Sequence, residues 1–107
     1  MIKRGEVWWV SFDPSLGGEI DKTRPAVIIS NDASNNALNR IQVIPFTSNI
    51  SKVYPCEALV TVKGKSSKAC ADQIATVSKQ RLKEKIGRLN ESDMEAVELA
   101  INIQLGL

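Results

Sequence analysis

The chain has 107 residues, of which 43% are hydrophobic and 24% are charged, and its formal net charge is +2. This length predicts one domain, residues 1–107, with a core large enough to fold without metal or disulfide staples. No apolar run approaches the roughly 18 residues of a membrane-spanning helix, and residues 1–6 lack the apolar core of a signal peptide. We therefore expect a cytoplasmic protein that does not enter a membrane.

Histidine is absent from the sequence, and the only cysteines are Cys56 and Cys70. These counts exclude a structural zinc site, Ser-His-Asp and Cys-His catalysis, and ribonuclease chemistry that uses paired histidines. In a reducing cytosol the two cysteines are expected to remain free thiols. We expect neither a metal ion nor a cofactor.

The small net charge is unevenly distributed along the chain. Residues 63–88 carry eight basic side chains against two acids, whereas residues 91–107 carry four acids and no base. A basic segment of this kind is typical of a surface that contacts a polyanion, and equally typical of solvated lysines. Charge alone does not choose between these two interpretations.

The predicted secondary structure is a series of short strands followed by one helix. β-Branched, aromatic or apolar runs predict six strands: residues 6–10, 24–30, 40–46, 57–62, 69–77 and 86–89. Helical turns are expected at residues 31–36 and 78–82, and a plain turn at residues 63–67. Pro45 indicates that the third strand lies at an edge or contains a bulge. Trp8 and Trp9 must point to opposite faces of the first strand, so we expect at least one to be partly exposed.

The residue pattern changes period at Asn90, which can cap a helix whose first turn holds Glu91 and Asp93. The apolar residues of this helix predict the face that packs on the core: Met94, Val97, Leu99, Ile101 and Ile103. Short strands followed by one terminal helix predict a mainly β fold with some α structure (α+β). The expected architecture is a small, strongly bent antiparallel sheet or barrel with a C-terminal α-helix.

One charged residue stands directly before the most apolar run of the sequence. Pro25 restricts Arg24 to extended backbone, so Arg24 is predicted to lie at the mouth of a strand, after a glycine-containing loop. Active sites are often built in this way, although a single arginine at such a junction is more often an ordinary surface residue. A second polar cluster, residues 47–49, follows the third strand.

Five segments are characteristic in their order and spacing: residues 3–9, 22–32, 43–49, 71–82 and 101–107. On these segments the sequence resembles the MazF/PemK family of toxins from type II toxin–antitoxin systems. The likeness covers essentially the whole chain. Any one of the motifs would be weak evidence, but the set together is specific.

The resemblance implies an SH3-like barrel with a C-terminal helix, acting as a homodimer. Family members cleave single-stranded RNA, chiefly mRNA, at short sequence motifs without a metal, and a cognate antitoxin protein neutralises them. By position, the family's catalytic arginine falls on Arg24 and its catalytic threonine on Thr47, while Glu19 matches an acidic position near the site. Residues expected to contact RNA are Lys22, Thr23, Ser48, Asn49 and Gln73. Trp8 or Trp9 is a candidate to stack on a base.

The chain departs from the family pattern in the loop before Arg24. Ile20 and Asp21 follow Glu19 here, whereas some members have glutamine and glycine after the glutamate. This difference leaves the behaviour of the loop and the cut sequence open, but it does not alter the residues that carry the chemistry.

The expected chemistry uses the 2′-hydroxyl of RNA as the nucleophile. The planar guanidinium of Arg24 suits the neutralisation of phosphorane charge, and the hydroxyl of Thr47 can donate to a phosphate oxygen or hold the 2′-oxygen. Glu19 is the candidate general base if the loop desolvates it; the alternative is a salt bridge from Glu19 to Lys22 or Arg24. The products would be a 2′,3′-cyclic phosphate and a 5′-hydroxyl.

Two other functions are compatible with the expected fold. CcdB-like toxins share it but trap DNA gyrase through an aromatic C-terminal end, and residues 104–107 contain no tryptophan. A non-catalytic RNA-binding module is the other alternative, which the presence of both Arg24 and Thr47 disfavours.

Overall fold

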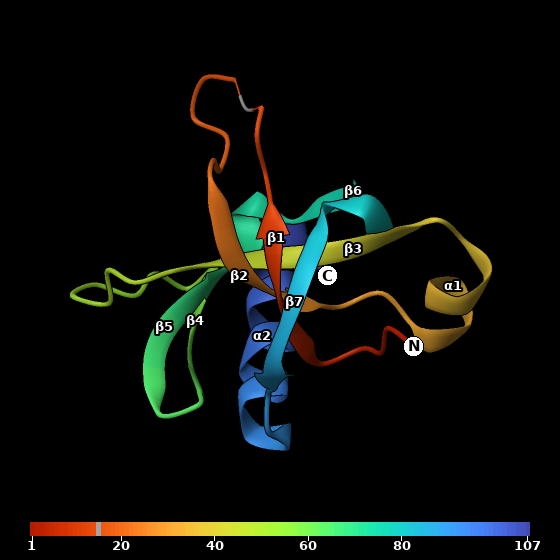
Figure 1. Ribbon diagram of the computed structural model, residues 1–107. Coiled ribbons are helices and arrows are strands. Elements are labelled where there is room, and N and C mark those ends of the chain that lie inside the picture. The colour runs from red at the N-terminus through yellow and green to blue at the C-terminus, as the bar shows by residue number, and fades with distance from the viewer. Residues whose placement is uncertain (15) are drawn as a thin grey trace.

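The computed structural model describes residues 1–14 and 16–107 and shows a mainly β fold with one long C-terminal helix (Figure 1). The strands are β1 (Glu6–Ser11), β2 (Thr23–Ile28), β3 (Arg40–Thr47), β4 (Glu57–Val62), β5 (Lys65–Cys70), β6 (Ala75–Ser78) and β7 (Leu82–Arg88). The helical elements are α1 (Asp32–Ala37), the 3-10 turns η1 (Ala71–Gln73) and η2 (Lys79–Arg81), and α2 (Glu91–Leu105). Within the described ranges, no helix is long and apolar enough to cross a membrane.

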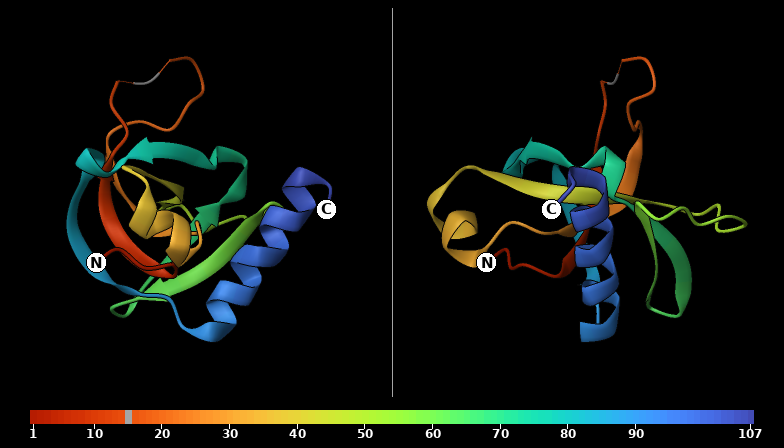
Figure 2. Two further views of the ribbon diagram at one scale, coloured as in Figure 1. Left: turned by 90° about the vertical axis from the view of Figure 1, so that its right-hand side faces the viewer. Right: turned by 180° about the vertical axis from the view of Figure 1, so that it is seen from behind.

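The strands form one antiparallel sheet in the order β4-β5-β3-β2-β1-β7, and β6 also pairs with β3. β3 is the central strand: it pairs with β2 on one side and, on the other, first with β6 and then with β5. The register between β1 and β7 shifts twice, on either side of Trp8. Because such irregularities bend a strand and increase its twist, they favour the strong curl of the sheet (Figure 2). The predicted fold class, a bent antiparallel sheet with a C-terminal helix, is confirmed.

Both faces of the central strands are buried. One core cluster lies on the α2 side of the sheet and contains Val7, Val27, Ile44, Phe46, Val60 and Val97. A second cluster lies on the opposite side and contains Val10, Phe12, Ile28, Ile41, Val43 and Val77. Successive residues of β2 and β3 alternate between the two clusters, which explains why β2 ends in an unbroken apolar run rather than an alternating one.

Helix α2 begins as the sequence predicts. The side chain of Asn90 accepts a hydrogen bond of 2.7 Å from the backbone N–H of Asp93. Its core face is narrower than expected, however, because Leu99 is 60% and Ile103 49% exposed. The helix packs mainly against β4 and η1, so a single stripe centred on the buried Val97 is sufficient to cover that edge.

The expected strand at 69–77 is wrong, because the chain turns through η1 in the middle of it. Residue 70 ends β5 opposite Glu57, whereas residue 75 begins β6 opposite Val43. The expected turn at 63–67 is also shorter, since Lys63 and Gly64 alone take the positive φ angles of the turn. The polar residues that follow form β5 because β4 supplies their hydrogen-bond partners.

Two further strand predictions need correction. The last strand, expected at 86–89, is the end of the longer β7, whose polar first half is exposed. Pro45 lies in the central strand, not at an edge. It falls between Val43, which pairs with β6, and Phe46, which pairs with β5, so the interruption that a proline requires occurs where β3 changes partner.

Candidate active site

The sheet brings together the two residues that were predicted to be catalytic. Ala26 of β2 pairs with Pro45 of β3, and Arg24 and Thr47 each lie two residues from this pair, at the same end of the antiparallel ladder. Both residues line one open hollow of about 160 Å³. The other residues around it are Trp9, Thr23, Pro25, Phe46, Ser48, Lys65 and Ser67. The start of β2 and the end of β3 therefore form a shared rim rather than two separate polar clusters.

The guanidinium of Arg24 is engaged by the loop that precedes it. Its Nε donates to the backbone oxygen of Asp21 at 2.9 Å, and its Nη2 lies 3.2 Å from Asp21 Oδ1. The side chain of Arg24 is 27% exposed and that of Asp21 is 47% exposed. Sequence reasoning singled out Arg24 but did not recognise Asp21 as its ionic partner.

Glu19 does not form the salt bridge that was considered for it. Its Oε1 accepts the backbone N–H of Leu16 at 2.7 Å, which closes a local turn. The side chain lines a different hollow, of about 250 Å³, together with Gln73 and Arg81. The described conformation thus brings Glu19 to neither Arg24 nor Thr47.

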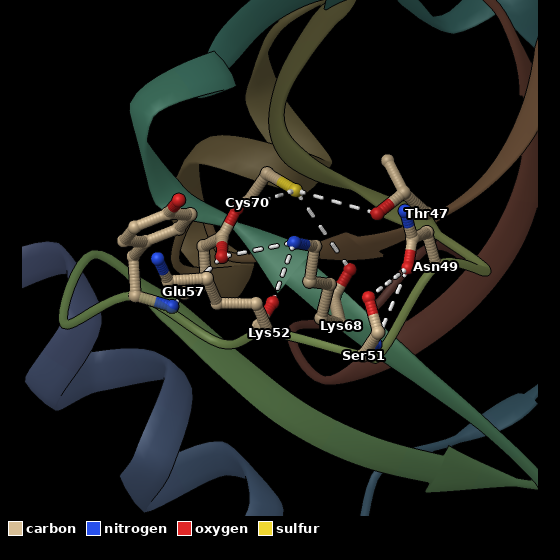
Figure 3. A network of polar contacts seen from close by, with 8 residues as sticks. Thr47, Asn49, Ser51, Lys52, Glu57, Lys68 and Cys70 are labelled. Atoms are coloured by element: carbon tan, nitrogen blue, oxygen red, sulfur yellow. Dashed lines mark hydrogen bonds and ion pairs between the residues drawn. The ribbon is translucent and has the colours of Figure 1, made fainter.

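Thr47 lies at one end of a polar network that crosses β4 and β5 (Figure 3). Thr47 is directly opposite Lys68 in the β3–β5 ladder, and its Oγ1 lies 3.9 Å from Cys70 Sγ. The Cys70 sulfur lies 3.8 Å from Glu57 Oε2, and Glu57 Oε1 is 3.1 Å from Lys68 Nζ. Lys68 Nζ also donates to the backbone oxygen of Lys52 at 2.9 Å. A largely buried ion pair therefore stands next to Thr47.

The charges in this network are fixed by their surroundings. Burial acts to raise the pKa of Glu57, but the backbone N–H of Tyr54 and the ammonium of Lys68 outweigh it and lower that pKa. Burial raises the pKa of the Cys70 thiol. At neutral pH the network therefore contains an ionised carboxylate paired with an ammonium group, and a neutral thiol beside Thr47.

A second hollow, of about 340 Å³, is also lined by Thr47. Asn49 and Gln73, both predicted to contact RNA, line this hollow with Glu57 and Lys68. Of the residues that the structure describes, Thr47 is the one that appears in the lining of both hollows.

The amide of Gln73 is already occupied by the loop between β1 and β2. Its Oε1 accepts the Ile20 N–H at 3.2 Å, and its Nε2 donates to the Gly18 oxygen at 3.3 Å. Gln73 therefore holds this loop against η1. Positioning of the loop is a role that the sequence did not indicate for Gln73.

The remaining predicted RNA-contacting residues are exposed. Thr23 and Ser48 line the hollow of Arg24 and Thr47. Lys22 is exposed, and its backbone N–H donates to Asp13 Oδ1 at 3.0 Å. The side-chain oxygen of Asn49 accepts from the backbone and the hydroxyl of Ser51. All four of these residues are exposed, and two of them, Thr23 and Ser48, share the hollow of Arg24 and Thr47.

The two tryptophans differ in exposure, as expected from their alternation. Trp9 is 39% exposed and lines the hollow of Arg24 and Thr47. Trp8 is half-buried, and its Nε1 donates to Glu6 Oε1 at 3.1 Å. Trp9 is therefore the tryptophan that is accessible in this hollow.

One group of metal-binding residue types occurs in the part of the chain that the structure describes. Ligand atoms of Glu57, Cys70 and Asp72 lie within 4.8 Å of one another. Lys68 already neutralises Glu57, and burial of the Cys70 thiol disfavours the thiolate that a metal requires. The group suits a hydrogen-bonded network better than it suits a metal ion.

The family assignment rests on the whole chain. A family model described as the PemK-like, MazF-like toxin of type II toxin–antitoxin systems matches residues 3–105. This chain belongs to that family. The MazF relatives at sequence level include Endoribonuclease MazF9 of Mycobacterium tuberculosis, which is 40% identical over 116 aligned positions that span 100% of this chain and 98% of the relative. Endoribonuclease MazF of Staphylococcus epidermidis is 38% identical and spans 100% of this chain and 93% of the relative.

Solved MazF structures share the fold. MazF of Deinococcus radiodurans superimposes with a TM-score of 0.88 at 27% identity, covering 99% of this chain and 97% of that one. A mycobacterial endoribonuclease in complex with its cognate antitoxin superimposes with a TM-score of 0.85 at 21% identity, covering 100% and 97%. At that identity the second likeness concerns the fold alone.

Proposed function

We propose that this chain is the toxin component of a type II toxin–antitoxin system and acts as a sequence-specific, metal-independent endoribonuclease. Its substrate would be single-stranded RNA, chiefly mRNA, cut by attack of the 2′-hydroxyl on the adjacent phosphate. The products would be a 2′,3′-cyclic phosphate and a 5′-hydroxyl. The observation that carries the proposal is that Arg24 and Thr47 line one hollow in a chain 40% identical to a protein named as an endoribonuclease.

Arg24 would neutralise the charge that develops on the phosphorane. Its fork of N–H donors matches two phosphate oxygens and remains charged at every physiological pH. Thr47, on the opposite strand, would donate its hydroxyl to a non-bridging oxygen or hold the 2′-oxygen in line with the phosphorus. One such donor typically contributes about 10²–10³ in rate.

Glu19 is the proposed general base, and this role requires the loop to move. In the described conformation its carboxylate accepts the Leu16 N–H instead of facing Thr47. Closure over bound RNA would bring Glu19 toward the 2′-hydroxyl and desolvate it. Glu19→Gln should then lower the cleavage rate by about 10²–10⁴, whereas Glu84→Gln, at an exposed position on β7, should not. Wild-type cleavage by Glu19→Gln would remove this assignment.

RNA would be bound by the exposed residues around the rim. Lys22, Thr23, Ser48, Asn49 and Gln73 are the proposed contacts. Trp9 would offer a face on which an unpaired base stacks. The two hollows that Thr47 lines would accept the nucleotides that flank the scissile phosphate.

The partners proposed for this chain follow from its family. A cognate antitoxin would neutralise it by laying an extended segment across the RNA site; a structural relative was solved in complex with its own cognate antitoxin. A homodimer and a cytoplasmic location, where mRNA is accessible, complete the proposal.

The proposal is tested by incubating the purified chain with a long single-stranded RNA in EDTA and mapping the new ends. Discrete cuts with 5′-hydroxyl ends are expected. Arg24→Ala should abolish these cuts. Arg40→Ala should not, because the exposed Arg40 lies at the end of β3 opposite to Thr47. Intact RNA with folded wild-type protein would contradict the nuclease. RNA that is bound but left intact would favour a non-catalytic RNA-binding module. If the chain neither cleaved nor bound RNA, a CcdB-like toxin that binds gyrase would be the alternative to test.

A further inference from the structure

Two N–H groups on one edge of the Arg24 guanidinium already donate hydrogen bonds within the protein. Nε and Nη2 form the edge that can bind two oxygens of a phosphate or a carboxylate side by side. In this protein both atoms are taken by Asp21, Nε by its backbone oxygen at 2.9 Å and Nη2 by Oδ1 at 3.2 Å. An RNA phosphate that approaches along this edge meets an anion that is already bound.

In the described conformation, hydrogen bonds hold the loop that carries Asp21 on both sides of that residue. Before it, Gln73 binds the Gly18 oxygen and the Ile20 N–H. After it, Lys22 has a φ angle of 67° and donates its N–H to Asp13. Since these contacts restrain the backbone around Asp21, the carboxylate is held beside Arg24 rather than meeting it by chance.

We propose that Asp21 is a resting-state counter-ion of Arg24 that occupies the position of the substrate phosphate and must be displaced for RNA to bind. This inference rests on the proposed function, in which Arg24 binds the scissile phosphate. Asp21 thereby sets substrate affinity, whereas it takes no part in the chemical step.

The exchange is energetically modest. The side chain of Asp21 is 47% exposed, so its carboxylate regains water when a phosphate replaces it. Ion pairs of this exposure contribute little, and their removal changes affinity by about two- to fivefold. Such a contact lowers affinity for weak anions but yields to a polyanion that also contacts the neighbouring rim.

The test measures anion binding at Arg24 directly, without cleavage. Inorganic pyrophosphate is titrated into ¹⁵N-labelled full-length protein while the Arg24 Nε–H signal is followed by NMR. Asp21→Asn and Asp21→Ala should bind pyrophosphate about two- to fivefold more tightly than the wild type. Glu84→Gln, which removes the same charge from an exposed position on β7, should bind as the wild type does. The amide spectrum of each variant verifies its fold.

Cleavage kinetics provide the second measurement. Asp21→Asn should lower KM for RNA by a similar factor and leave kcat within about twofold of the wild type. Unchanged or weaker pyrophosphate binding in both Asp21 variants would overturn the inference, as would a wild-type Arg24 signal that pyrophosphate does not shift. A fall in kcat with Asp21→Asn would overturn it too, because Asp21 would then be holding Arg24 in its productive position.

The two proposals fail in distinguishable ways. If the wild type does not cut RNA but the Asp21 variants bind pyrophosphate more tightly, the nuclease proposal fails and Asp21 remains the counter-ion of an anion site. If the wild type cuts RNA and the variants do not gain affinity, the inference about Asp21 fails and the nuclease remains.

Discussion

At the scale of single residues, Thr47 has the most informative surroundings. It lines both hollows, faces Lys68 across the β3–β5 ladder and has the Cys70 sulfur 3.9 Å from its hydroxyl. Its hydroxyl would therefore be within reach of an RNA strand bound along the rim formed by the start of β2 and the end of β3. Its methyl group carries no chemistry, so the hydroxyl alone should account for its effect on the reaction.

Replacing that hydroxyl with a methyl group tests this directly. Thr47→Val should lower the single-turnover cleavage rate by about 10²–10³, whereas Thr47→Ser should stay within about tenfold of the wild type. Thr76→Val, at an exposed threonine on β6, serves as the matched control. Equal rates for Thr47→Val and the wild type would exclude Thr47 from the chemistry.

At the scale of elements, the loop between β1 and β2 and the turn η1 act together. Gln73 connects them through both of its amide atoms, to Gly18 and Ile20. The connection between β1 and β2 stands out from the sheet (Figure 1), and Ile20 within it packs against the second core cluster. We expect the loop to depend on Gln73 for its position.

Gln73→Leu keeps the size of the side chain and removes both hydrogen bonds. The Ile20 amide should then exchange with deuterium about five- to tenfold faster, which corresponds to the loss of about 1 kcal/mol of protection. The Phe12 amide, which donates to the Lys22 oxygen at 2.8 Å, should keep its exchange rate. Unchanged exchange at Ile20 would show that Gln73 does not hold the loop.

The sequence predicted the elements whose residues carry a local signal. The unbroken apolar run of β2 correctly indicated burial on both faces, and Asn90 correctly indicated the start of α2. Lys65 and Lys68 carry no strand signal in the sequence. They are part of a strand because β5 pairs with β4. The position of Lys68 opposite Thr47, and the pairing of Asp21 with Arg24, depend on register and loop conformation, which local sequence does not encode.

At the scale of the whole molecule, two carboxylates link stability to pH. Burial acts to raise the pKa of Glu6, but its contacts with Lys85, the Lys3 N–H and Trp8 outweigh burial and lower it from 4.5. The pKa of Glu57 is lowered in the same way, with Tyr54 and Lys68 as its main partners. A carboxylate whose pKa is lower in the folded state stabilises the fold above its unfolded pKa, and this contribution disappears as the pH falls through the folded pKa.

The melting temperature should therefore fall as the pH decreases below about 4.5, the ordinary pKa from which both groups are lowered. Glu57→Gln should lower the free energy of unfolding by about 1–3 kcal/mol at pH 7, because it leaves the Lys68 ammonium without its ionic partner. It should also reduce the fall of the melting temperature at acid pH. Circular dichroism melts from pH 3 to pH 7 measure both effects, with Glu84→Gln as the control. If the melting temperatures of Glu57→Gln and Glu6→Gln fell with decreasing pH as steeply as that of the wild type, this account would be contradicted.

The central claim is that the chain cleaves RNA by using the RNA's own 2′-hydroxyl, aligned by Arg24 and Thr47. The most direct measurement uses a strand that contains a mapped cut site and a single 2′-deoxynucleotide on the 5′ side of the scissile phosphate. We expect cleavage at that phosphate to disappear, while a second cut site in the same strand is cleaved at its normal rate. Cleavage that persists at the deoxy-substituted position would require a water or protein nucleophile and would contradict the account.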